Sequence, residues 1–271
     1  MRYFIFILAI LLISSSTFAI KIENINDSVH LECHYKYIMF RDTLTTDNIY
    51  RDSMILRIGK KYTSFFSYYR LQEDSIEASP DCKELRLKLF HTRIHNLDSI
   101  RKAGIATTYE YLYKDLNMDS CYIYGKIGAP GMKKNVVVIE KIPQIKWTIS
   151  DSLKTICGYD CIKATTTFRG RIYVAWFTKD LPWKEGPWKL CGLPGLILEA
   201  YDSKKHYYFM AERIILSPKS QIKEYNWDDK EPQLIDRLLY LRNLYEDESR
   251  FPIVYQGTEH GFDLLETDYK N

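Results

Sequence analysis

The stretch that decides the fold is GPWKLCGLPGLILEAYD, residues 186–202. Pro194 and Gly195 form the pair typical of a type II turn, because proline presets φ at the second position and glycine accepts a positive φ at the third. Gly192 adds a further permissive position. The apolar run 196–200 follows directly, and such a run is typical of a strand that is covered on both faces. We therefore predict a rigid turn that leads into a central strand.

The connection before this turn, residues 179–195, is long and contains several prolines and tryptophans. Long connections without secondary structure are uncommon unless they are functional or tightly packed. We expect this one to fold back over the sheet as a lid on one end of the core. A second interpretation is that its apolar side chains wall a groove for an apolar ligand or a peptide. The side chains available for such a wall are Trp176, Trp183, Trp188, Leu190 and Leu193.

Most of the chain has the pattern of β-strands. In SVHLECHYKYIMF, residues 28–40, apolar side chains alternate with His30, Glu32, His34 and Lys36, which predicts a half-buried antiparallel strand. TFRGRIY predicts a hairpin whose tight turn is Arg169–Gly170. Other stretches are rich in β-branched and aromatic residues. They are 52–70 (two strands joined around Gly59), 119–127, 134–141, 145–149, 161–168, 171–178, 195–201 and 206–216.

Two helices interrupt this pattern. Ser79 is a suitable N-cap, and apolar residues recur at helical spacing as far as Gly104, so a helix is predicted over roughly residues 81–103. A second helix is predicted after NWDDKEP, with Asp228 or Asp229 as its cap. Many strands with short connections favour an α+β fold with a predominantly antiparallel, curved, half-barrel-like sheet and two main helices on one face or end. By analogy of fold, such sheets resemble the half-barrel carriers of lipids and lipoproteins in bacterial envelopes.

The N-terminus predicts export. Arg2 precedes an apolar run over residues 3–13, serines follow, and Ala19 is a small residue suited to signal-peptidase cleavage. The run is shorter than the roughly 20 apolar residues that cross a bilayer, so a cleaved signal peptide is favoured over an anchor. We expect a signal peptide over residues 1–19, a single domain over 20–271 and no transmembrane span in the mature chain.

The bulk charge and the cysteines restrict the function further. The net charge of +3 argues against a nucleic-acid partner. Six cysteines in a chain bound for an oxidising compartment favour disulfides.

The sequence contains little that is typical of catalysis. His91 and His95 are spaced to share a metal, but Thr92 stands where a His-Glu-x-x-His peptidase needs glutamate, and no third ligand converges. His30 and His34 also share a face without a further ligand. Cys191 is a conceivable thiol nucleophile, although its surroundings have no triad spacing. Its conceivable helpers are Asp180, Glu199, Asp202 and His206. We expect no metal and no cofactor.

The chain resembles the GLPGLI family, secreted proteins of Bacteroidetes-type bacteria. The resemblance is carried by GLPGLI at residues 192–197, by the wider segment 156–202, and by MILRIGKKYTSFFS at residues 54–67. It implies a signal peptide, an exported protein and a function that the family leaves open, and it carries no catalytic residues. Cys161 and Cys191 flank the most family-like segment, so we predict that they are neighbours and form a disulfide. Two buried thiols, or a local Cys157–Cys161 bridge, are the alternatives.

These observations predict an exported, non-enzymatic binding or envelope-interaction protein. Its partner would be an envelope protein, a lipid or a peptide, held in an apolar groove between the sheet and the lid. The alternative is an exported hydrolase or metallopeptidase-associated enzyme that uses His91 and His95, or Cys191.

Overall fold

The computed structural model describes residues 25–40, 49–94, 106–129, 132–224, 230–250 and 264–270. The predicted signal peptide lies outside these ranges. Within them, no helix combines the length and the apolar character needed to cross a membrane.

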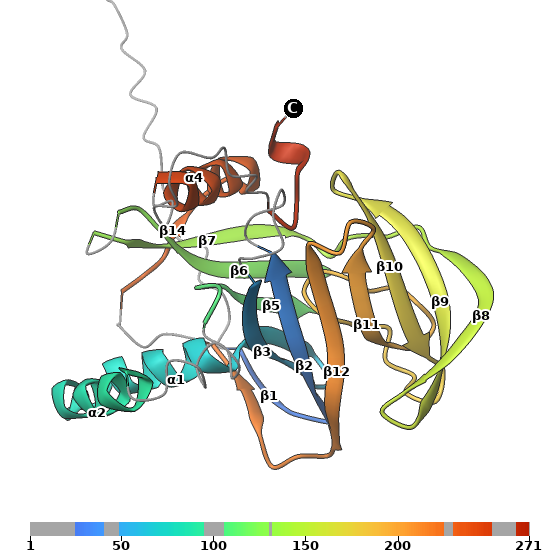
Figure 1. Ribbon diagram of the computed structural model, residues 1–271, viewed down its shortest axis with the longest axis horizontal. Helices are drawn as coiled ribbons and strands as arrows, with labels where there is room; N and C mark the ends of the chain where they lie inside the picture. The colour runs from blue at the N-terminus through green and yellow to red at the C-terminus, as the bar shows by residue number, and fades with distance from the viewer. Residues whose placement is uncertain are drawn as a thin grey trace, which may run out of the picture.

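A twelve-stranded sheet dominates the molecule (Figure 1), and its strands follow the order β14-β7-β6-β5-β4-β3-β2-β12-β11-β10-β9-β8. Neighbours are antiparallel except at the short β14–β7 pair. The sheet is open and curved, which confirms the predicted α+β class and antiparallel architecture. The strand bounds are β2 Leu31–Phe40, β3 Ile49–Ile58, β4 Tyr62–Ser67, β5 Tyr111–Asp115, β6 Ser120–Ile127, β7 Lys134–Lys141, β8 Thr148–Ile156, β9 Tyr159–Phe168, β10 Arg171–Thr178, β11 Leu196–Asp202, β12 Tyr207–Leu216 and β14 Gln233–Leu234.

Bulges lie in two neighbouring strands of this sheet. Leu198 of β11 is an extra residue opposite the Trp176–Phe177 step of β10, and Glu212 of β12 is an extra residue opposite β2. Each bulge bends its strand and increases the local twist. The bulges therefore contribute to the curvature of the sheet around its concave core.

The concave core contains the lid, the connection formed by residues 179–195. Leu190 and Leu193 are fully buried and share one hydrophobic cluster with inward-facing residues of strands β2 to β12. The lid also pairs with β11, since Leu196 N donates to Leu181 O (2.9 Å) and Ile197 N donates to Glu185 O (2.9 Å). The expected packing of this connection over the sheet is therefore present.

Strand β11 confirms the prediction from its apolar run: it lies between β10 and β12 and almost all of its residues are buried. The predicted type II turn before it is wrong. Gly195 N donates to Leu193 O (2.8 Å), which makes a γ-turn centred on Pro194. The amide of Leu196 cannot close the predicted turn because it is paired with the lid.

A second hydrophobic cluster covers the convex face. It joins Tyr62, Phe66, Tyr111 and Tyr124 to residues of a small two-stranded sheet formed by β1 (Asn26–Ser28) and β13 (Gln221–Lys223). Helix α1 (Tyr68–Glu77) begins directly after β4, and its N-cap Ser67 accepts a hydrogen bond from Arg70 N.

The helices differ in part from the predictions. Residues 68–70 were expected to continue a strand, but they begin α1. The predicted helix over 81–103 is present as α2 (Cys82–Ile94), and residues 95–105 lie outside the described residues. Helix α4 (Arg237–Arg250) starts later than expected because Asp236 provides the cap, accepting from Leu239 N (3.0 Å). The expected caps Asp228 and Asp229 lie outside the described residues. Figure 1 shows α1 and α2 together at one end and α4 above β6 and β7.

Candidate functional site

A cavity of about 340 Å³ opens where α4, the lid and the start of β5 meet the concave sheet. Its walls are mainly aromatic and aliphatic, and the aromatic members come from six separate parts of the chain. Those aromatic side chains are Tyr37, Tyr50, Tyr109, Trp188, Tyr207 and Tyr240. A concave site with these walls and a few polar groups is the usual form of a small-molecule site.

Glu110 is the central polar group of this cavity. Tyr240 of α4 donates a hydrogen bond from its hydroxyl to Glu110 Oε1 (2.9 Å). Burial raises the pKa of the Glu110 carboxyl, and burial also raises the pKa of Tyr240. The pair requires a glycine at position 125 of β6, because a Cβ on Gly125 would lie 2.2 Å from the Tyr240 hydroxyl.

A buried network of charges forms one rim of the cavity. Lys189 of the lid contacts Glu140 of β7 (2.7 Å) and also Glu266. Arg169 bridges the same two carboxylates, at 2.8 Å to Glu140 and 3.0 Å to Glu266. Burial alone would lower the pKa of Lys189, but Glu266 and Glu140 outweigh that effect and raise it. The network thus links the lid and β7 to the C-terminal segment through ion pairs.

A buried carboxylate, Asp52 of β3, holds the opposite wall. Its Oδ2 accepts from Thr107 N (2.7 Å) and Thr107 Oγ1 (2.9 Å), and its Oδ1 accepts from Ser67 Oγ (2.8 Å). Burial raises the pKa of Asp52 to about 6, although the hydrogen bonds from Thr107 oppose the shift. Asp52 therefore ties the cavity wall at residues 106–108 to the first turn of α1.

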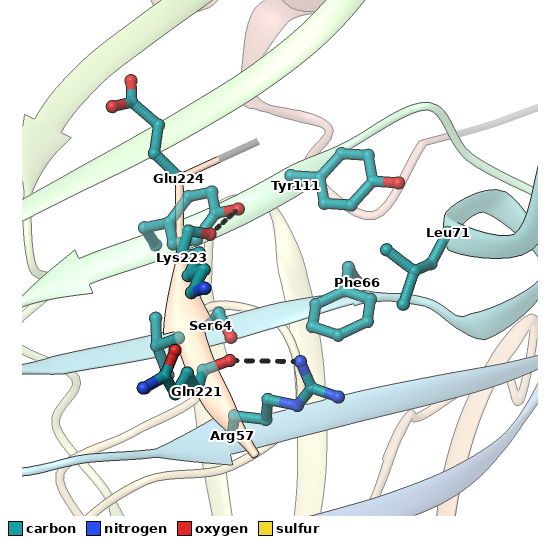
Figure 2. Close-up of a pocket in the computed structure, with 10 residues that line it drawn as sticks. Arg57, Ser64, Phe66, Leu71, Tyr111, Gln221, Lys223 and Glu224 are labelled. Carbon is teal, nitrogen blue, oxygen red and sulfur yellow. Dashed lines mark hydrogen bonds between the residues drawn. The ribbon is translucent and has the colours of Figure 1, made fainter. Parts of the chain in front are cut away.

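A second pocket, of about 400 Å³, lies on the convex face between the sheet and β13 (Figure 2). Phe66 and Tyr111 stack at its floor with ring centroids 5.8 Å apart. Arg57 donates to Gln221 O (3.3 Å) across it, as the dashed line in Figure 2 marks. The lining here repeats the contacts that hold β13 to the sheet, and so the concave cavity is the stronger candidate site.

The five predicted wall residues differ in whether they line the concave cavity or pack in the core. Trp188 lines it, whereas Leu190 and Leu193 are buried in the core below it. Trp183 packs, partly buried, against the core. Trp176 of β10 is also partly buried against the core, and Lys154 Nζ is 4.4 Å from its ring centroid. Of the five, the structure thus brings Trp188 to this cavity.

The predicted Cys161–Cys191 disulfide is wrong, because all six cysteines are free. The two thiols have different surroundings: Cys161 Sγ donates to Tyr159 O within its own strand, and Cys191 Sγ donates to Pro143 O. The local Cys157–Cys161 bridge is absent as well. Burial raises the pKa of Cys191, which disfavours its thiolate and therefore a role as nucleophile.

The histidines do not form a metal site in the described part of the chain, where no three His, Cys, Asp or Glu residues are grouped for a metal. His91 is exposed on α2, and His95 lies outside the described residues. His34 and Glu32 form a pair at 2.8 Å, and His30 is exposed.

A family model described as "Protein of unknown function (Porph_ging)", a family of Bacteroidetes-type proteins, matches residues 169–199. The match falls inside the segment 156–202 that resembles the GLPGLI family. The family resemblance is confirmed. The Porph_ging segment comprises the end of the β9–β10 hairpin, the lid and the first half of β11, and so it supplies Trp188, Lys189 and Arg169 to the cavity and its rim.

Solved structures of PNGF-II share the fold. Two of them, in space groups C2 and P21, superpose with a TM-score of 0.50 at 15% and 14% identity and cover 80% of this chain. This chain spans 33% of the PNGF-II chain, about a third of its length. At this identity the likeness concerns the fold alone. A comparison with curated proteins gives no significant match.

The sequence patterns did not identify Glu110, Tyr240 or Lys189. One signal was present: Glu110 directly precedes the aromatic strand β5 and Lys114 lies within it, and charged groups that are buried at such positions are rare without a specific partner. The partners themselves, Tyr240 and Glu185, are separated from them by long stretches of chain.

Proposed function

We propose that this chain is an exported, non-enzymatic binding protein whose ligand site is the concave cavity beside α4. The observation that carries the proposal is the cavity itself, which combines six aromatic side chains with the Glu110–Tyr240 pair. Aromatic walls favour an apolar body, and the polar pair favours one oriented hydrogen-bonding group. The ligand class is therefore an amphipathic molecule, either a lipid or a short peptide.

Three of the charged side chains at the cavity are held in ion pairs, which supports binding rather than proton transfer by these groups. Lys189 and Arg237 are engaged by Glu266, and Arg70 is engaged by Asp74. Groups fixed in ion pairs are poor at moving protons during a reaction, since each change of protonation would leave a partner unpaired. The export of the protein is supported by the N-terminal pattern and by the resemblance to the GLPGLI family.

A fluorescence titration with 1-anilinonaphthalene-8-sulfonate, an amphipathic probe, tests the site. Leu244 of α4 lines the cavity, so Leu244→Trp fills it, and we expect at least a tenfold weaker affinity for the probe. Leu239 lies on the same helix and is exposed, so Leu239→Trp is the matched control and leaves the affinity unchanged. Equal binding by the two variants, with both folded, would contradict the proposal.

Mass spectrometry of the gently extracted native protein tests the ligand class. We expect a lipid or peptide that copurifies with the wild type and with Leu239→Trp but is lost from Leu244→Trp. A lipid and a peptide differ in fragmentation pattern, so the same spectrum separates these two classes.

A further inference from the structure

Residues 264–270 lie in a groove that has the features of a receptor for a peptide. This C-terminal segment ends in the short helix η1 (Asp268–Lys270) and lies beside α4 and the β9–β10 turn. Figure 1 shows it in red near the C-terminus, next to α4. We use the word groove for the six residues that contact this segment, which are Arg169, Gly170, Arg171, Tyr173, Lys189 and Arg237.

The groove holds the backbone of the segment at three successive points. Arg171 Nε donates to Leu264 O (2.8 Å), and Tyr173 donates from its hydroxyl to Leu265 O (2.6 Å). Thr267 N then donates to Arg169 O (2.9 Å). These contacts need only an extended chain, so they do not depend on the identity of the bound side chains.

The turn below the segment is shaped for this approach. Arg169 and Gly170 both have positive φ, as in a type I′ turn, which confirms the predicted tight hairpin turn. A Cβ on Gly170 would lie 2.2 Å from Thr267 Oγ1. The missing side chain thus leaves the space into which the peptide fits.

Two carboxylates give the groove its specificity. Glu266 is buried and receives ion pairs from Arg169, Lys189 and Arg237. Asp268 receives a bidentate pair from Arg237, at 2.7 and 3.0 Å. Arg237 and Arg169 lower the pKa of Asp268, although burial opposes them. Fork-like recognition of this kind selects carboxylates at a fixed spacing.

Most of the receptor belongs to the segment that the family model matches. Five of the six groove residues fall within residues 169–199, and Arg237 on α4 is the sixth. The occupant lies outside that match.

We propose that this groove is a binding site for an acidic, extended peptide, which residues 264–270 fill in cis and which a segment of a partner protein can fill in trans. The partner segment has two apolar residues followed by acidic residues at the third and fifth positions, as in Leu264-Leu265-Glu266-Thr267-Asp268. This inference goes beyond the proposed function, because it concerns a macromolecular partner, although Lys189, Arg237 and residues 264–266 also line the cavity.

The test uses the full chain with a specific protease site introduced into residues 251–263. After cleavage, a fluorescent peptide with the sequence of residues 264–271 is added, and its anisotropy reports exchange with the native segment. We expect saturable binding to the cleaved protein and none to the uncleaved protein. The same peptide with Glu266→Gln and Asp268→Asn binds at least tenfold more weakly.

Matched receptor variants locate the binding. Arg237→Gln removes contacts to both carboxylates and lowers the peptide affinity at least tenfold. Arg242→Gln on the same helix alters a long hydrogen bond from Nε to the Tyr269 carbonyl (3.4 Å) and leaves the Arg237 contacts in place, so it changes the affinity less than threefold. A folded, cleaved protein that does not exchange the peptide, or that binds the neutralised peptide equally well, overturns the proposal.

If cleavage unfolds the protein, hydrogen exchange on the uncleaved chain tests the proposal instead. The amide of Thr267 donates to Arg169 O (2.9 Å). Exchange at this amide at least 100-fold faster than at core amides of β11 supports a detachable segment. If the Thr267 amide and the core amides of β11 both exchange only through global unfolding, the proposal is overturned, because the segment is then an integral part of the fold.

Discussion

Gly195 has no room for a side chain. A Cβ at this position would lie 1.9 Å from the carbonyl oxygen of Thr178, the last residue of β10. The backbone of the turn therefore rests directly against the end of the neighbouring strand. Gly192, three residues earlier, has a φ of +90°, but a Cβ there would make only an ordinary contact, 4.0 Å from the Ile145 carbonyl oxygen. The two glycines are needed for different physical reasons, a close approach and a left-handed backbone.

These reasons predict different costs. Gly195→Ala forces a shift of backbone atoms and is expected to lower the free energy of unfolding by about 3 kcal/mol or more. Gly192→Ala meets only the penalty for positive φ, about 1–2 kcal/mol. Urea unfolding of both variants measures the difference. Equal losses would contradict the close approach between residues 178 and 195.

Glu32 makes stability depend on pH. Hydrogen bonds from His34 and then from Arg57, opposed by burial, lower the pKa of Glu32 to about 2 from its ordinary 4.5. A carboxyl whose pKa is lower in the folded state stabilises the fold above its unfolded pKa and loses this contribution as pH falls toward the folded value. The relevant window is therefore pH 4.5 to 2.

Glu32→Gln tests this dependence. We expect the variant to be less stable than the wild type by about 1–2 kcal/mol at pH 7, after allowance for solvent screening. The difference should shrink as pH falls from 4.5 and vanish near pH 2. Unfolding curves collected across this range measure it, and a constant difference would rule out the pKa shift as its origin.

At the scale of elements, the lid is attached to the sheet by a buried ion pair. Lys114 of β5 contacts Glu185 of the lid at 2.7 Å, and both side chains are buried. Burial alone would lower the pKa of Lys114, but Glu185 outweighs it and raises the pKa. Such a pair specifies where the lid docks, because either charge without its partner would be buried alone.

Breaking the pair should therefore cost far more than replacing it. Lys114→Met is expected to lower stability by about 3–5 kcal/mol, whereas Lys114→Met combined with Glu185→Leu recovers most of that loss. The exposed pair Lys88–Glu84 on α2 is the control, and Lys88→Met should change stability by less than about 1 kcal/mol. A double variant no better than Lys114→Met would show that the pairing is not the cause.

At the scale of the whole molecule, one core joins the two halves of the sheet through the lid. Leu190 is fully buried in the cluster that spans β2 to β12. We predict that Leu190→Ala lowers stability by about 2–5 kcal/mol and that unfolding remains a single transition. Tryptophan fluorescence and far-UV circular dichroism should give coincident curves. Two separated transitions would contradict a single domain, and the exposed Leu153 provides Leu153→Ala as a control with little effect.

The sequence predicted those features that depend on neighbouring residues. The alternation of Val29 to Tyr37, the apolar run of β11 and the Arg169–Gly170 turn are local patterns, and all three are confirmed. Helix α1 was missed because Tyr68 and Tyr69 prolong an aromatic strand pattern, while the cap at Ser67 depends on Asp52. The disulfide prediction failed, and the Glu110–Tyr240 pair of the cavity was not identified, for one reason: both depend on contacts between residues far apart in the chain.

The bulges at Leu198 and Glu212 have a consequence for how such a chain can change in length. Successive side chains of a strand lie on opposite faces of the sheet, so one inserted residue decides on which face every following side chain lies. Removing Leu198 would exchange the two faces of β11 on one side of the deletion, so that side chains packed on one buried face would have to pack on the other. Loops elsewhere tolerate insertions and deletions, but between Leu196 and Leu216 related chains should keep the same number of residues in each strand, even where the residues themselves differ.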